Sequence, residues 1–167
     1  LVLVEGLVLV RKERYDVERE LREWFRGAGR VVVVGVGNPL RMDDLVGVKI
    51  VRDLKGKVDE NRVMLIEAET IPENHLQEII DYKPTHALLI DAAVLDLEAG
   101  ETRLFKPEQL TSFLAFSTHA LPLRIFCEYL VKSAGIAVAL LLIEPERTEF
   151  GEGLAHAIVQ SEQEIVR

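Results

Sequence analysis

The chain has 167 residues, of which 49% are apolar and 29% are charged, and its formal net charge is -8. This length suits a single domain with a hydrophobic core of its own. The negative charge argues against a nucleic-acid surface, which needs clustered lysine and arginine. Because Cys127 is the only cysteine, an internal disulfide is impossible, and a reducing cytoplasm is the expected compartment.

We interpret the first 29 residues as an N-terminal extension, because the regular alternation of strands and helices begins only after them. Residues 1–10 are apolar apart from Glu5. This run is too short to span a bilayer, and neither a basic leader nor a cleavage site marks a signal peptide. Asp16 is a favourable N-cap, and the apolar residues after it recur at helical spacing until two glycines end the segment. We therefore expect a helical extension over residues 1–29, which could cover one edge or face of a single α/β domain over residues 30–167.

Strands alternate with helices through the rest of the chain. The β-branched run at residues 31–34 is typical of a strand buried on both faces. In chain order the pattern predicts strands over 31–34, 63–66, 87–90, 102–105 and 136–143, and helices over 44–54, 72–82, from 122 to about 135, and through Leu154, Ile158 and Ile165. This alternation predicts the α/β class, as a three-layer α/β/α sandwich with a mostly parallel, twisted five-stranded sheet.

Three polar residues should meet at one edge of this sheet, because ligands of open α/β sheets bind beyond the carboxyl ends of the strands. Asp44 follows the first strand, Asp91 ends the third, and His119 precedes a helix. Two carboxylates and one imidazole suit a borderline divalent cation with an open coordination position. Each residue also has a structural interpretation: a helix-dipole partner for Asp44, a strand-end loop residue for Asp91, and a hydrogen-bonded histidine near a helix start for His119.

Other catalytic arrangements find less support. The glycines at 35 and 37 lack the third glycine of the dinucleotide fingerprint, and the acids at 43 and 44 would repel phosphate. No Ser-His-Asp or Cys-His arrangement is evident, and Cys127 lies in a segment typical of a packed helix. The HExxH sequence of one class of resident-zinc proteases is absent. A covalent acyl-enzyme and a zinc protease of that type are therefore disfavoured.

Several ordered motifs lie on the loops of this pattern: residues 35–40 (GVGNPL) with Asp43 and Asp44, 67–74 (EAETIPEN), 91–93 (DAA) with 99–101 (AGE), 117–123 (STHALPL) and 143–145 (IEP). Together they resemble the hydrogenase maturation endopeptidase family, in its energy-converting or hydrogenase-3-type branch. The similarity covers roughly residues 31–160 and implies a phosphorylase/hydrolase-like α/β/α fold. Leu45 departs from a glycine common in that family, and residues 68–69 depart from a glycine-rich pair.

The resemblance implies an endopeptidase that removes a short C-terminal extension from the large-subunit precursor of a nickel-iron hydrogenase after nickel insertion. Its catalytic and metal-contacting positions fall on Asp44, Asp91 and His119. The nickel would be supplied by the substrate and used as a recognition element, with no resident organic cofactor. Substrate contacts are expected at Gly37, Asn38, Asp43, Glu73 and Thr118.

The expected partner is that precursor, without nucleic acid or membrane insertion, and the expected state is a monomer. The main alternative is a non-catalytic nickel-binding chaperone for hydrogenase assembly, which would bind free nickel tightly and make no cut. A third candidate is an unrelated α/β hydrolase-like domain that acts on small peptides or nucleosides. It would cleave generic substrates, which a nickel-directed protease would not.

Overall fold

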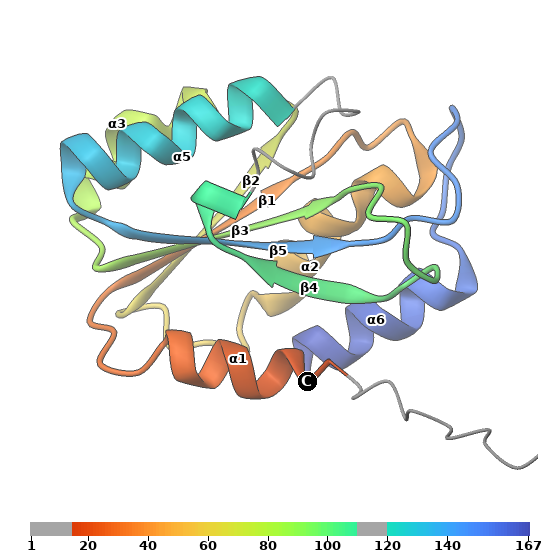
Figure 1. The fold of residues 1–167 in the computed structure, drawn as a ribbon, viewed down its shortest axis with the longest axis horizontal. Coiled ribbons are helices and arrows are strands. Elements are labelled where there is room, and N and C mark those ends of the chain that lie inside the picture. Colours follow the sequence, from red (N-terminus) through yellow and green to blue (C-terminus); the bar gives the residue numbers. More distant parts are fainter. Residues whose placement is uncertain (1–14, 110–119) are drawn as a thin grey trace, which may run out of the picture.

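The computed structural model describes residues 15–109 and 120–167, with side chains of the second segment described from residue 123 onward. Strands and helices alternate along most of this chain, as the sequence predicts (Figure 1). In chain order the elements are α1 (Val17–Trp24), β1 (Val31–Val36), η1 (Met42–Leu45), α2 (Val46–Leu54), β2 (Val63–Glu69), η2 (Pro72–His75), α3 (Leu76–Tyr82), β3 (His86–Ala92), β4 (Thr102–Phe105), η3 (Pro107–Gln109), α5 (Ala120–Ala134), β5 (Ala137–Ile143) and α6 (His156–Val166).

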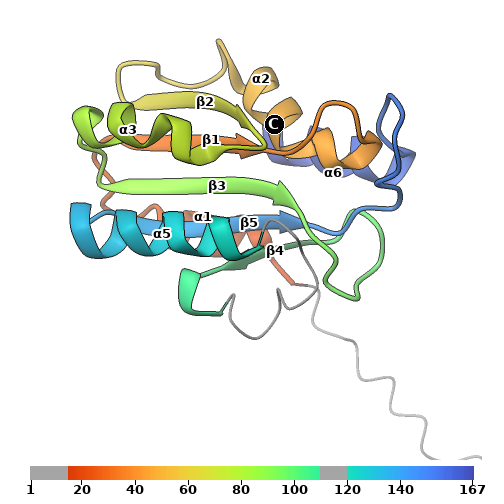
Figure 2. The same ribbon diagram turned by 90° about the horizontal axis from the view of Figure 1, so that it is seen from above.

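The described strands form one five-stranded sheet in the order β2-β1-β3-β5-β4. β1 pairs in parallel with β2 and β3, and β3 pairs in parallel with β5. Only β4, at one edge, runs antiparallel to its neighbour β5. The mostly parallel α/β sheet predicted from the sequence is therefore confirmed, and the carboxyl ends of its four parallel strands share one edge (Figure 2).

Helices cover both faces of the sheet, which makes the predicted three-layer sandwich. Alternate residues of β1 face opposite ways: Val32 and Val34 pack with α3 and α5, whereas Val31 and Val33 pack with α2 and α6. All six residues of β1 are buried, as a central parallel strand requires. Figure 1 shows α3 and α5 above the sheet, with α1 and α6 below it.

The predicted N-terminal helix is present as α1, and its N-cap is Asp16, whose side chain accepts a hydrogen bond from the backbone N–H of Arg19. Its apolar face packs against the lower core, where the rings of Trp24 and His86 meet edge to face at 5.0 Å. The helix ends at Trp24 rather than at the glycines beyond it.

Tyr15, just before α1, contacts the edge strand β4. Its hydroxyl accepts a hydrogen bond from the backbone N–H of Leu104 at 3.0 Å and donates one to Glu20 Oε2 at 2.7 Å. Burial, together with the hydrogen bond to Glu20, raises the pKa of Tyr15 to about 12. These two hydrogen bonds tie the residue just before α1 to the edge of the sheet.

Several predicted boundaries shift by a few residues. The helices expected at 44–54 and 72–82 each begin with a 3-10 turn, and Pro72 suits such a start because it has no N–H to satisfy. β3 continues through Asp91 to Ala92, and α5 begins at Ala120, before the proline expected to open it. Within residues 15–109 and 120–167, none of the helices is long and apolar enough to cross a membrane.

Candidate active site

The sheet order reverses at β1: β2 lies on one side of it and β3 on the other. In doubly wound sheets this reversal opens a crevice at the carboxyl ends of the two central strands, and ligands bind there. Asp44 follows β1 in the turn η1, and Asp91 is the penultimate residue of β3. The structure therefore places both predicted carboxylates at the crevice between these strands.

Two glycines let the chain after β1 pack tightly over the strand ends. A Cβ atom at Gly47 would lie 2.1 Å from the carbonyl oxygen of Ile90 and 2.3 Å from that of Val36, so only glycine allows α2 to sit on β1 and β3 this closely. A Cβ atom at Gly37 would lie 1.8 Å from the carbonyl oxygen of Asp44, and its φ of 145° also favours glycine. These contacts fix the position of Asp44 relative to β1.

Asp44 is half-buried, and one of its two carboxylate oxygens accepts a hydrogen bond from its own loop. Its Oδ2 atom accepts a hydrogen bond from the backbone N–H of Asn38 at 2.9 Å. The side-chain oxygen of Asn38 in turn accepts from the N–H of Leu40 at 2.9 Å. The second oxygen of Asp44 has no hydrogen bond within the described part of the chain, so it is free for a ligand.

Asp91 is 9% exposed, and its Oδ1 atom accepts a hydrogen bond from the N–H of Ala92 at 2.8 Å. Burial raises the pKa of Asp91 from 3.8 to about 8; the negative charge of Asp44 adds to the rise, and the N–H of Ala92 opposes it. Among the described residues neither carboxylate has a salt-bridge partner. Asp91 can therefore gain or lose a proton near neutral pH, and a cation bound at this site would favour its ionised form.

The adjacent Asp43 has a structural role that the sequence did not reveal. It is fully buried, and its two oxygens accept three backbone N–H bonds, from Glu146 at 3.0 Å, Arg147 at 2.7 Å and Ala155 at 2.7 Å. These contacts tie the loop after β1 to the loop after β5, more than one hundred residues away in sequence. Substrate contact by this side chain, as expected from the sequence, stays a prediction.

Glu144, at the end of β5, holds the loop that follows β3. The side chain is 7% exposed, and its Oε2 atom accepts hydrogen bonds from the N–H of Leu95 at 2.6 Å and of Leu97 at 3.3 Å. This glutamate lies in a motif quoted above, but the sequence did not indicate its partners. Two buried acids thus order two of the loops around the site.

The remaining predicted site residues differ in how they are placed. The N–H of Gly37 donates to the carbonyl of Glu69 at 2.9 Å, which joins the loops after β1 and β2, and Glu73 is exposed in η2. Thr118 and His119 lie outside the described residues. No group of three or more possible metal ligands occurs within residues 15–109 and 120–167, so two of the three predicted ligands are described, and the metal site stays a prediction.

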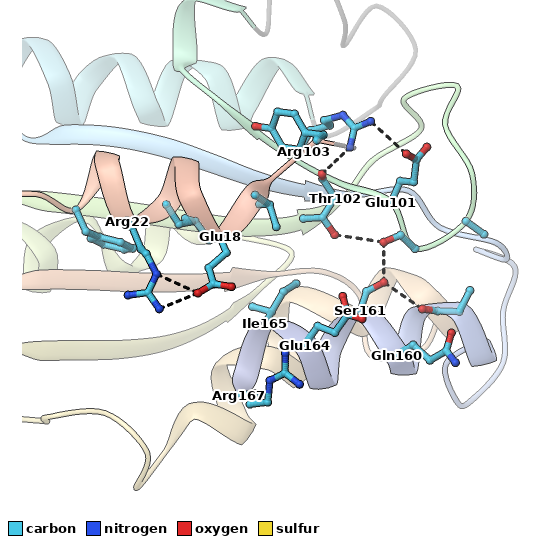
Figure 3. A pocket seen from close by; sticks show the side chains of 17 residues that line it. Glu18, Arg22, Glu101, Thr102, Arg103, Gln160, Ser161, Glu164, Ile165 and Arg167 are labelled. Carbon is cyan, nitrogen blue, oxygen red and sulfur yellow. Dashed lines mark hydrogen bonds and ion pairs between the residues drawn. The ribbon is translucent and has the colours of Figure 1, made fainter. Parts of the chain in front are cut away.

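A separate cavity lies between α1, α6 and β4 (Figure 3). Its volume is about 990 Å³, and charged residues of both signs line it, among them Arg22, Arg103 and Glu164. None of the residues predicted for the active site lines this cavity. The crevice that carries Asp44 and Asp91 is therefore the candidate active site on chemical grounds.

The fold and the site together define a doubly wound α/β protein whose ligand crevice carries two neighbouring carboxylates. The chain belongs to the hydrogenase maturation protease (HycI) family, which it matches over residues 48–167. This membership agrees with the resemblance noted in the sequence motifs, and it makes the protein a hydrolase that acts on peptide bonds.

Individual relatives support the assignment. A Methanocaldococcus jannaschii protein, provisionally assigned as a hydrogenase maturation protease, is 33% identical over 137 residues, or 78% of this chain and 80% of that one. The hydrogenase 3 maturation protease of Escherichia coli K12 is 29% identical over 119 residues, 71% and 75% of the two chains. The crystal structure of the [NiFe] hydrogenase maturation protease HycI from Thermococcus kodakarensis matches with a TM-score of 0.81 and 30% identity, covering 88% of this chain and 94% of that one.

Proposed function

We propose that this protein is a cytoplasmic endopeptidase that removes a short C-terminal extension from the large-subunit precursor of a nickel-iron hydrogenase. Family membership supports the protease activity and the link to hydrogenase maturation. The observation that carries the finer proposal is the pair Asp44 and Asp91 at the crevice between β1 and β3. The negative charge of Asp44 contributes to the raised pKa of Asp91, and neither carboxylate has a salt-bridge partner among the described residues. Such a pair suits a metal ion brought by the substrate.

In this proposal nickel is part of the substrate. The free oxygen of Asp44 and the carboxylate of Asp91 contact the ion, and His119 supplies a third ligand. A precursor without nickel lacks this contact and binds more weakly, so cleavage waits until the metal has been inserted. Nickel acts as a recognition element that positions the scissile peptide bond against the protease.

The hydrolysis itself needs a water molecule and a proton acceptor. A water oxygen adds to the scissile carbonyl carbon, and Asp91 accepts the proton that this water loses. The carbon–nitrogen bond then breaks, and the same proton passes to the leaving amine. Asp91 suits this role because it lies at a rigid strand end. Burial raises its pKa to about 8 in the metal-free protein, and the positive charge of the substrate's nickel would favour the ionised form that accepts the proton.

The test is to incubate the protein with nickel-loaded and with nickel-free precursor and to measure the masses of the products by mass spectrometry. We expect a short C-terminal peptide to be lost only from the nickel-loaded form, and we expect Asp91→Asn and His119→Ala to abolish the cut while the fold survives. Normal cleavage by either variant would refute the assignment of these residues. No cleavage by the wild type, combined with tight stoichiometric nickel binding, would instead support a nickel chaperone.

A further inference from the structure

The loops around the crevice expose large apolar side chains. Leu40 is 64% exposed, Ile71 50%, Val94 64% and Phe150 76%. Each lies on a different loop, after β1, β2, β3 and β5 respectively. We call these four residues the apolar collar. Because the four parallel strands end at one edge of the sheet, the collar belongs to the same edge as Asp44 and Asp91 (Figure 2).

Backbone hydrogen bonds hold the collar in place. The N–H of Gly151 donates to the carbonyl of Leu40 at 3.0 Å, and the N–H of Met42 donates to the carbonyl of Gly151 at 3.1 Å, so the loops that carry Leu40 and Phe150 are joined. The guanidinium of Arg41 lies 5.4 Å from the centre of the Phe150 ring, and its Nε atom donates to the carbonyl of Thr148. Phe150 is therefore exposed on an ordered support.

The backbone on each side of Val94 is held by a hydrogen bond. The N–H of Ala93 donates to the carbonyl of Ile143 at 3.0 Å, and the N–H of Leu95 donates to the buried carboxylate of Glu144. A valine between two such anchors cannot turn inward without breaking one of them. Exposed apolar side chains on preformed loops are typical of protein interaction sites, since little ordering entropy is lost on binding.

Acidic residues lie on or next to the same four loops as the collar. We call this set the acidic ring: Glu69, Glu73, Asp96, Glu98, Glu146, Glu149 and Glu152, all exposed. The same loops carry only two arginines, Arg41 and Arg147. In the described part of the chain, no residue of the acidic ring has a salt-bridge partner. The loops that carry the apolar collar therefore also carry an excess of negative charge.

We propose that the apolar collar and the acidic ring form the docking surface for the folded hydrogenase precursor, and that the precursor presents an apolar patch bordered by lysine and arginine. This inference rests on the proposed function, since the collar adjoins the crevice into which the scissile segment must enter. A second copy of this chain fits the surface poorly, because the two acidic rings would repel each other. A surface that surrounds the reaction centre lets the enzyme recognise a whole protein and not merely a short peptide.

The apolar part of the docking surface is tested by steady-state cleavage of nickel-loaded precursor. Phe150→Ala should raise KM about tenfold and leave kcat within about twofold, because the side chain binds the partner and takes no part in the chemistry. Tyr129→Ala, at an exposed aromatic on α5, is the matched control and should leave both values unchanged. Val94→Ser and its control Ile125→Ser form a second pair. An unchanged KM in both collar variants would overturn the proposal.

The acidic ring of the docking surface is tested by the dependence of KM on salt concentration. Glu149→Gln combined with Glu152→Gln should raise KM and reduce its dependence on ionic strength, because fewer charges attract the basic border of the partner. Glu23→Gln combined with Asp81→Asn removes two carboxylates on α1 and α3 and should leave the salt dependence as in the wild type. A wild-type KM that does not change with salt would refute the basic partner.

A binding measurement separates this inference from the proposed function. The affinity of the wild type and of Phe150→Ala for the precursor is measured by titration calorimetry. If the wild type binds but does not cut, a tenfold weaker affinity in Phe150→Ala still supports the docking surface, while the proteolytic proposal fails. If the wild type cuts and Phe150→Ala binds equally well, the docking surface fails alone. If the wild type neither binds nor cuts, both are refuted.

Discussion

Replacing Asp91 with asparagine should stabilise the protein while abolishing its activity. Burial and the charge of Asp44 raise the pKa of Asp91 from 3.8 to about 8. Between these two values the folded state holds a proton that the unfolded state has lost, so the free energy of unfolding falls as pH rises from about 4 to about 8. Asparagine has no proton to lose, and its Oδ1 atom can still accept the hydrogen bond from Ala92.

The size of the effect follows from the pKa shift. Each pKa unit corresponds to about 1.4 kcal/mol, so the interval of about three units between 3.8 and pH 7 sets an upper limit of about 4 kcal/mol for Asp91→Asn. Half of this limit would raise Tm at pH 7 by about 4–8 °C for a chain of this length. Below pH 4 the gain should disappear, because aspartic acid is then neutral in both states.

The assay is thermal unfolding of the metal-free protein, followed by circular dichroism from pH 4 to pH 8. The difference in Tm between Asp91→Asn and the wild type should grow steadily with pH. Asp44→Asn is the control: it removes only the second cause of the raised pKa, so its gain should be smaller. A Tm difference that is zero or negative at pH 8, or one that does not change with pH, would refute this account of the pair.

Three further predictions concern buried residues. Asp43→Asn should lower the free energy of unfolding by about 3 kcal/mol, measured by urea titration, because one of two acceptor oxygens becomes a donor that faces a backbone N–H. Gly47→Ala should cost about 2 kcal/mol or more in the same titration and reduce cleavage, since its Cβ atom meets two backbone carbonyls. Cys127 should resist alkylation by iodoacetamide at pH 8 unless the protein unfolds, because burial raises its pKa to about 12; rapid labelling of the native protein would contradict this.

The sequence predicted the fold where local pattern determines it. The β-branched run of β1 and the apolar run of β3 mark strands that must be buried on both faces, and the helices between them require parallel pairing. The rule that ligands bind at strand ends then selected Asp44 and Asp91, and the structure brings these two together. Their catalytic roles remain predictions, as do the roles of Thr118 and His119, which lie outside the described residues.

Features that depend on contacts between distant segments could not be predicted from the sequence. Asp43 lies next to Asp44 and looks like a second site acid, but its partners are backbone amides of the loop after β5. The apolar collar is spread over four loops, so its members show no common spacing. A single sequence reveals periodic burial well, because the pattern involves residues that are close together along the chain. It reveals contacts between loops poorly, because nothing local encodes them.

The contact of Tyr15 with β4 bears on how accessible the edge of the sheet is to strands of other molecules. An edge strand presents unpaired backbone groups on which strands of other molecules can assemble, and natural proteins protect such edges. Here the phenol satisfies the N–H of Leu104. Tyr15 therefore occupies a backbone position of β4 with which a strand of another molecule would otherwise pair.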